Sequence, residues 1–211
     1  MIIYTGQTTS TKLDKIKKLG MGVMISSHPN TAPSKDLKDV PCALDNGAFT
    51  CYKKGYPFQE DVFLETIKKA YKLNLTLDFI VCPDIVAGGK ESLKFSLEWA
   101  KRLKTAPNLA LVLQDGMEER DLDSYTLRFF THLFIGGSVK WKWDNADKWA
   151  KFARDKGKKI HIGQCGKLQY LKKAKVLKVG SVDSTSFTVN DSFDIVEEFI
   201  IGNQQVLFAS E

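Results

Sequence analysis

Short apolar runs alternate with longer segments of mixed polarity along the chain. Eight of these runs are six or seven residues long, and most are rich in β-branched or aromatic residues, which is typical of strands. The runs cover residues 1–6, 22–27, 42–47, 78–84, 109–115, 132–137, 159–164 and 178–184. Because most of them are apolar at consecutive positions, we expect both faces of each strand to be buried, as in a parallel sheet.

Most of the segments between the runs carry apolar residues at helical spacing. The predicted helices cover residues 11–20, 58–74, 90–104, 117–130, 144–157, 166–175 and 191–202, whereas residues 28–40 lack a clear helical pattern. Regular alternation of strand and helix predicts parallel strands, and eight such units favour a compact (β/α)8 TIM-type barrel. A doubly wound open sheet is the alternative. No repeat, low-complexity tract or linker divides the chain, so residues 1–211 are predicted to form a single domain.

Polar residues and one glycine pair stand where the predicted strands end. These positions are Asp45, Asp84 after Pro83, Gln114 with Asp115, Gly136 with Gly137, Gln164 and Asp183. The carboxyl ends of all strands of a barrel meet at one mouth, where the active sites of such barrels lie. Each residue alone suits a turn, but carboxylates that converge without cations repel one another and raise each other's pKa values. The sequence therefore predicts a polar active site at this mouth.

The residue inventory narrows the chemistry of this site. The chain has four cysteines without a C-x-x-C pair, and its acids form no compact ligand motif. A divalent metal held by the three aspartates is possible but not indicated, and no cofactor is predicted. Core or surface roles are favoured over a general-base role for the three histidines, His28, His132 and His161. That leaves carboxylates as nucleophile and acid/base, a pair suited to substitution at an anomeric carbon.

Charge and hydropathy bear on partners and location. The net charge of +6 and the pI near 9 permit contact with a polyanion, although basic residues are often only a solvated surface. No window approaches the roughly 18 to 20 apolar residues of a membrane span, and the first residues do not read as a secretory signal. We therefore expect a cytoplasmic protein without membrane contact, or one in the host cytoplasm if its source is a virus.

The ordered motifs LDNGAF, CPD, LQDG, IGG and VDSTSF resemble those of the tRNA-guanine transglycosylase superfamily. In its small size the chain is most similar to the DpdA-type members, which place 7-deazaguanine bases in DNA. The resemblance covers about residues 40 to 187. It implies that Asp183 is the nucleophile that attacks C1′ of the target guanosine and that Asp45 is the acid/base. It also implies a set of base-binding residues, namely Asp84, Gln114, Gly136, Gly137, Asn46, Phe49 and Gln164.

Two departures from that pattern affect the predicted substrate. No cysteine or histidine follows Asp183, so the zinc-binding subdomain of the tRNA enzymes is not expected here. The glycine motif continues as SVKWKWDN, which supplies cations and rings for a flipped or single-stranded nucleic acid. The predicted nucleic-acid contacts are Lys140, Trp141, Lys142, Trp143, Lys53 and Lys54. The alternative interpretation of the run is a helix start with buried tryptophans.

The resemblance and the residues together predict an enzyme that exchanges guanine in DNA for a free 7-deazaguanine base through a covalent Asp183 intermediate. Three other possibilities remain open. The acceptor could be tRNA, the enzyme could be an N-glycosidase or nucleoside hydrolase that releases the base, or the chain could be a non-catalytic nucleic-acid-binding module.

Overall fold

The computed structural model describes residues 1–8 and 10–208, so residues 9 and 209–211 of the predicted domain lie outside the described part. Within it, eight parallel strands pair in chain order, and β8 closes on β1 through Ile2 and Ser181. The strands are β1 (Ile2–Gly6), β2 (Gly22–Ser26), β3 (Cys42–Asp45), β4 (Leu77–Val81), β5 (Leu109–Leu113), β6 (His132–Ile135), β7 (Lys159–Ile162) and β8 (Ser181–Asp183). The closed ring confirms the (β/α)8 TIM-type barrel and contradicts the open sheet.

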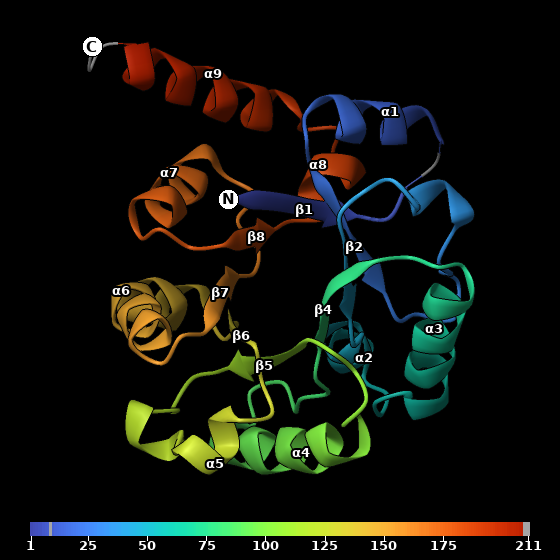
Figure 1. Cartoon of the computed structure of the whole chain (residues 1–211), viewed down its shortest axis with the longest axis vertical. Coiled ribbons are helices and arrows are strands. Elements are labelled where there is room, and N and C mark those ends of the chain that lie inside the picture. The colour runs from blue at the N-terminus through green and yellow to red at the C-terminus, as the bar shows by residue number, and fades with distance from the viewer. Residues whose placement is uncertain (9, 209–211) are drawn as a thin grey trace.

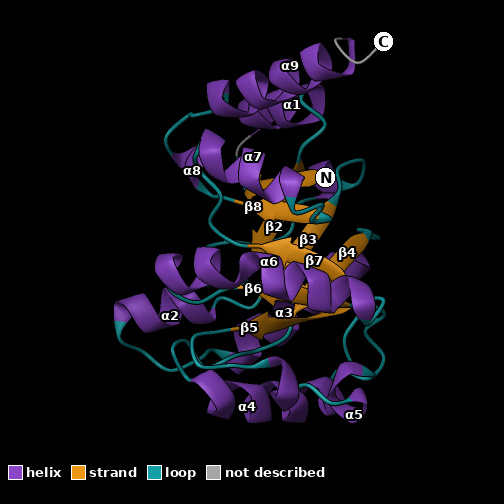
Figure 2. Ribbon diagram, turned by 90° about the vertical axis from the view of Figure 1, so that its left-hand side faces the viewer, coloured by secondary structure: helices purple, strands orange, loops and turns teal. Residues whose placement is uncertain are grey.

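Helices surround the strands, as Figures 1 and 2 show from two directions. They are α1 (Ser10–Lys18), α2 (Ala48–Lys54), α3 (Glu60–Lys72), α4 (Gly89–Arg102), α5 (Ser124–Leu127), α6 (Val139–Asp155), α7 (Leu168–Val176), α8 (Ser186–Val189) and α9 (Asp194–Phe208). A 3-10 turn, η1 (Lys35–Leu37), is the only helical element within residues 28–40, which agrees with their weak pattern. None of the described helices has the length and apolar character needed to cross a bilayer.

One predicted helix is wrong. Residues 117–130 form a 3-10 turn, η2 (Glu119–Asp121), and the short α5 instead of one continuous helix. Side chains that accept backbone hydrogen bonds divide this segment. Asp121 accepts from the Glu118 N–H at 2.9 Å and Asp123 from the Thr126 N–H at 2.7 Å, so each caps a separate turn. Helices α2 and α8 were not predicted, because each is only about two turns or shorter.

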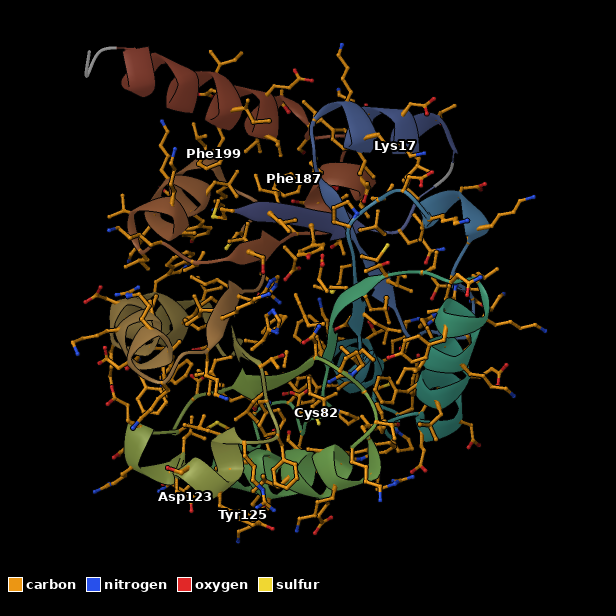
Figure 3. All side chains as sticks on the ribbon, in the orientation of Figure 1. Lys17, Cys82, Asp123, Tyr125, Phe187 and Phe199 are labelled. Carbon is orange, nitrogen blue, oxygen red and sulfur yellow. The ribbon has the colours of Figure 1, made fainter. Side chains whose placement is uncertain are left out.

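Two apolar layers hold the barrel together. The larger layer lies between the strands and the outer helices, where Cys82 is fully buried and its thiol contacts the Ser96 carbonyl of α4 at 3.2 Å, whereas Tyr125 lies at the outer edge (Figure 3). The smaller layer fills the barrel interior with Tyr4, Met24, Ala43, Phe79, Val81, Ala110 and Val112, and Phe134 packs against it. The interior is therefore a packed core, as is usual for this fold.

Candidate active site

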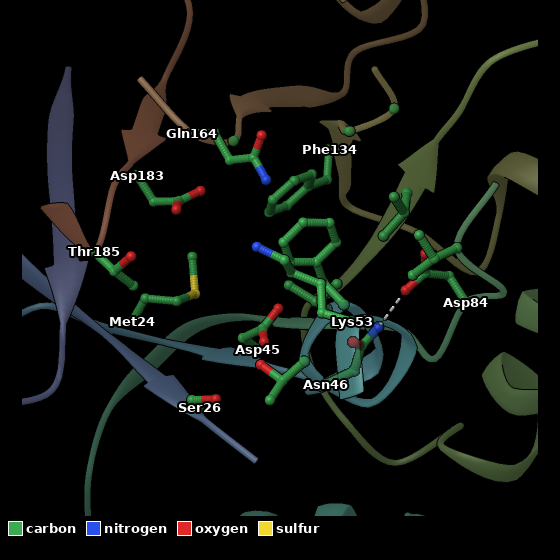
Figure 4. Close-up of a pocket in the computed structure, with 18 of the residues that line it drawn as sticks. Met24, Ser26, Asp45, Asn46, Lys53, Asp84, Phe134, Gln164, Asp183 and Thr185 are labelled. Atoms are coloured by element: carbon green, nitrogen blue, oxygen red, sulfur yellow. Dashed lines mark hydrogen bonds between the residues drawn. The ribbon is translucent and has the colours of Figure 1, made fainter. Parts of the chain in front are cut away.

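A cavity of about 830 Å³ lies at the carboxyl ends of the strands, where the sequence predicted the site. Figure 4 shows Asp45, Asp183 and Gln164 around it, with Phe134 and Met24 between them. Among the predicted site residues, the lining includes Asp183, Asp45, Asp84, Asn46, Phe49, Gln114, Gly136, Gly137, Gln164, Lys53 and Lys142. Lys54, Lys140, Trp141 and Trp143 are not part of the lining.

Asp183 is the last residue of β8, and its side chain is 17% exposed. Its Oδ1 lies 2.9 Å from Nε2 of His161, whose Nδ1 lies 2.8 Å from the hydroxyl of Ser181. His161 and Ser181 are opposite each other in the pairing of β7 with β8. His161 is fully buried, which is one of the two roles expected for it, but its contact with Asp183 was not predicted. The alternation of residues along β7 could have placed His161 on the inward face. The strand register that brings it beside Asp183 cannot be inferred from the sequence.

Asp45 ends β3, and its Oδ2 accepts a hydrogen bond from the Gly47 N–H at 3.0 Å. Gly47 has a φ of 79°, and a Cβ there would lie 2.2 Å from the Ser27 carbonyl oxygen, so this turn requires glycine. Burial raises the pKa of the Asp45 carboxyl to about 7; the Gly47 bond opposes the rise, and repulsion from Asp183 and Asp84 adds to it. Asp45 therefore exchanges a proton near neutral pH.

Asp84 is buried and is held by two amides from neighbouring strand ends. The Asn46 amide donates to Oδ1 at 2.7 Å, shown as a dashed line in Figure 4, and the Gln114 amide donates to Oδ2 at 2.5 Å. Burial raises the pKa of Asp84 to about 6, although both amide bonds lower it. Because the Gln114 carbonyl oxygen also accepts from the Gly88 N–H at 3.1 Å, Gln114 is largely engaged within the protein. Its evident role is to hold Asp84, whose carboxylate retains lone pairs for a ligand.

The predicted glycine pair lies at the cavity wall and forms the turn into α6. Gly137 has a φ of 73°, and a Cβ there would lie 2.4 Å from Oδ1 of Asp115. Asp115 accepts bonds from the backbone N–H of Ser138 at 2.7 Å and from its hydroxyl at 2.6 Å, and Ser138 caps α6. The absence of side chains at Gly136 and Gly137 therefore serves both the turn and access to the wall.

Apolar side chains form much of the remaining wall. Met24, Val81, Val112 and Phe134 line the cavity and belong to, or pack on, the barrel interior. At the rim, Ala87 and Gln164 have φ values of 59° and 62°, a left-handed conformation that is uncommon for residues other than glycine. An apolar wall with a few fixed polar groups is typical of a small-molecule binding site.

Lys142 does not lie on an outer surface, so the prediction that it belongs to an exposed nucleic-acid surface is wrong. It is 2% exposed, and its Nζ donates to the Gly163 carbonyl at 2.6 Å inside the barrel mouth. Burial lowers the pKa of Lys142, whereas Cys165 and Asp183 oppose that shift. The amine therefore contributes to the electrostatics of the cavity.

The rest of the same run forms the first turn of α6, which agrees with the alternative interpretation. Trp143 stacks on Tyr170, with ring centroids 4.8 Å apart and planes inclined by 17°. Trp141 and Trp143 both pack against the outer core, and Lys140 pairs with Asp144 at 2.5 Å. The Trp143 ring is therefore engaged by Tyr170, and both tryptophans are partly covered by the outer core, so neither presents a free ring face of the kind expected for base stacking.

The basic and aromatic surface at the rim lies instead on α2. Phe49 is 46% exposed and Tyr52 is 60% exposed, and Lys53 Nζ lies 5.6 Å from the Phe49 ring centroid. Lys54 is exposed, with its Nζ 3.0 Å from Nε2 of His28. Tyr52 was missed by the sequence reasoning, because the short α2 was not predicted and its faces could not be assigned.

In the part of the chain that the structure describes, no three His, Cys, Asp or Glu side chains are grouped to ligate a metal ion. Neither the protein-family models nor the curated proteins provide a match to this chain.

Proposed function

We propose that this barrel is a guanine transglycosylase that exchanges guanine in DNA for a 7-deazaguanine base. The observation that carries the proposal is a pair of aspartates on one cavity in different environments. Asp183 Oδ1 lies 2.9 Å from Nε2 of His161, whereas burial raises the pKa of Asp45 to about 7. This arrangement suits one carboxylate as nucleophile and the other as acid/base. The ordered sequence motifs give the same roles.

In the first half-reaction, a guanine leaves the base stack and enters the mouth, because C1′ is not accessible within a duplex. The Asp183 carboxylate attacks C1′, and an O–C1′ bond forms as the bond from C1′ to the guanine nitrogen breaks. The electron pair of the broken bond goes to that nitrogen, and protonated Asp45 supplies a proton to the departing ring. The product is a deoxyribosyl ester of Asp183 and free guanine.

In the second half-reaction, the 7-deazaguanine base occupies the position that guanine left. Asp45 accepts the proton of its ring nitrogen, which attacks C1′ and returns the electron pair of the ester bond to Asp183. Asp84 binds the N–H edge of either base, and the apolar wall of Met24, Val112 and Phe134 contacts its faces. Holding both bases in one orientation favours exchange over hydrolysis.

We further propose that the acceptor polymer lies across α2. The exposed rings of Phe49 and Tyr52 suit stacking on nucleotides beside the flipped guanine, and Lys53 and Lys54 suit contacts with phosphates. Phe49 and Lys53 also line the cavity, so this face is continuous with the proposed base site. This assignment replaces the contacts that were expected from the first turn of α6.

Incubation with guanine-containing DNA and labelled free guanine tests the proposal directly, because only an exchanger transfers label into the polymer. We expect incorporation into DNA and none with Asp183→Asn. Release of free base without incorporation would identify a hydrolase. Incorporation of label into tRNA but not DNA would identify tRNA as the acceptor. Absence of both exchange and base release would favour a non-catalytic binding module.

A further inference from the structure

A buried imidazole lies directly behind the carboxylate of Asp183, and none of the steps above uses it. Both ring nitrogens of His161 have partners: Nε2 lies 2.9 Å from Asp183 Oδ1, and Nδ1 lies 2.8 Å from the Ser181 hydroxyl. Ser181 and Asp183 are both on β8, two residues apart, so both side chains lie on the same face of the strand. The three groups form a continuous chain from the barrel interior to the cavity.

The surroundings fix the imidazole in place. His161 is fully buried, and its ring centroid lies 4.4 Å from that of Phe134, 5.1 Å from that of Phe79 and 6.0 Å from that of Tyr4. Gly163, two residues further along, leaves room for this arrangement, since a Cβ there would lie 2.8 Å from the Phe134 ring and 3.4 Å from Asp183 Oδ1. Rotation of the imidazole would break two hydrogen bonds and disturb three aromatic contacts.

We propose that Ser181 and His161 form a relay that positions the Asp183 carboxylate, with Oδ1 bonded to His161 and Oδ2 left to react. An ionised carboxylate accepts hydrogen bonds and donates none, so Nε2 carries the proton of this contact. Ser181, bonded to Nδ1, holds the ring in that orientation. His161 is thus a positioning residue: its Nε2 holds the Asp183 carboxylate, and the Ser181 contact at Nδ1 fixes the orientation of the ring.

The catalytic consequence rests on the proposed function. When Oδ2 bonds to C1′, Oδ1 becomes the carbonyl oxygen of the ester and can still accept from Nε2–H. When the incoming base displaces the ester, the electron pair of the O–C1′ bond returns to the carboxylate, and the same N–H stabilises the charge that develops there. The relay therefore supports both half-reactions, and its loss should lower kcat more than it raises KM.

The geometry is tested without any activity, by proton and nitrogen NMR of the histidine side chains in ¹⁵N-labelled protein. We expect a downfield Nε2–H proton resonance that disappears in His161→Phe and moves upfield in Asp183→Ala. Its absence from the wild type, or an unchanged position in Asp183→Ala, would overturn the relay. This result stands whether or not the protein exchanges bases.

The catalytic role is tested with three variants and one control in the exchange assay. His161→Phe retains the ring packing but removes the N–H, and we expect kcat to fall about 100-fold with little change in KM. His161→Gln, which restores a donor near Nε2, should recover part of that loss, and Ser181→Ala should lie between it and the wild type. His132→Phe is the control, because His132 is also buried beside Phe79, with ring centroids 4.8 Å apart, but has no bond to Asp183.

These measurements separate the two proposals. If the wild type exchanges no base but the NMR resonance behaves as expected, the proposed function fails and the relay stands. If the wild type exchanges base and His161→Phe matches His132→Phe in kcat, the catalytic role of the relay is overturned. An equal loss of kcat in His161→Phe and His161→Gln would likewise contradict a role for the donated hydrogen bond.

Discussion

Asp45 and Asp183 are the same residue type on the same cavity, and their neighbours give them different properties. Asp183 faces the buried His161 ring, whereas the Asp45 side chain is bonded to the Gly47 N–H. Burial and two neighbouring carboxylates raise the pKa of Asp45 to about 7 in spite of that bond. The proposed division into nucleophile and acid/base therefore rests on the different environments of the two carboxylates.

The raised pKa of Asp45 predicts how stability depends on pH. A carboxyl with a pKa of about 7 in the folded protein and about 3.9 unfolded binds more protons when folded, so its contribution to stability is lost as pH rises between these values. Asp45→Asn mimics the protonated form at every pH. We expect its melting temperature to match that of the wild type near pH 4 and to exceed it increasingly up to pH 8. A constant difference from pH 4 to 8 would contradict the shift.

Residues at strand ends were more predictable than the residues that support them. Asp45, Asp84 and Asp183 each follow an apolar run, so their convergence follows once a barrel is assumed. The role of His161 depends on the register between β7 and β8, and that of Gln114 on the approach of two loops. Neither relation is encoded in local pattern, which is why His161 was expected only in a core or surface role and Gln114 was assigned to the base.

At the scale of elements, the start of α6 explains why the KWKW run was misassigned. With the helix beginning at Val139, Lys142 shares one face with Ala146, Trp149 and Ala153, all of which are buried. Ala146, Trp149 and Ala153 follow Lys142 by four, seven and eleven residues, and this helical spacing would have indicated the buried face. The helix was expected to begin at residue 144, so the run before it was assigned to nucleic-acid contacts.

The side chains of the KWKW run are buried or partnered, whereas those of Tyr52, Lys53 and Lys54 on α2 are exposed, so the proposed DNA contacts are expected on α2. Replacing Lys53 and Lys54 with Ala should weaken binding to single-stranded DNA of any sequence and reduce the salt slope by about 0.7 per lost phosphate contact. Tyr52→Ala should cost about 1–3 kcal/mol of binding free energy if a base stacks on the ring. Fluorescence anisotropy over a range of salt concentrations measures both effects.

Lys140→Ala is the matched control for those variants, because Lys140 is an exposed lysine near the mouth that is paired with Asp144. We expect it to bind DNA as the wild type does. Weakened DNA binding by Lys140→Ala, together with unchanged binding by the α2 variants, would show that the polymer contacts α6 and not α2.

At the scale of the whole molecule, the alternation of strand and helix, interrupted only at residues 28–40, was enough to favour the barrel over an open sheet. Eight apolar runs gave the eight strands in order, since parallel pairing by crossovers leaves few other arrangements. Closure then brings the strand ends to one mouth and creates the cavity. The lengths of short helices such as α2 and α5 were not predictable, because caps and tertiary contacts decide them.

The ligand chemistry of the whole described chain leads to a prediction about metal removal. Because no cluster of three ligand side chains is formed among residues 1–8 and 10–208, dialysis against a chelator should leave the melting temperature and exchange activity unchanged. Differential scanning fluorimetry before and after dialysis measures the first and the label assay the second. Loss of either, restored by a divalent metal, would show that the aspartates act as ligands.

The most direct test of the central claim is to locate the covalent bond. The protein is mixed with guanine-containing DNA, quenched with acid, digested with nuclease and protease, and analysed by mass spectrometry. We predict a deoxyribose-linked adduct on the peptide that carries Asp183. The adduct should be absent without DNA and absent in the Asp183→Asn variant, whose melting temperature should equal that of the wild type. An adduct on another residue, or full exchange activity in Asp183→Asn, would contradict the account.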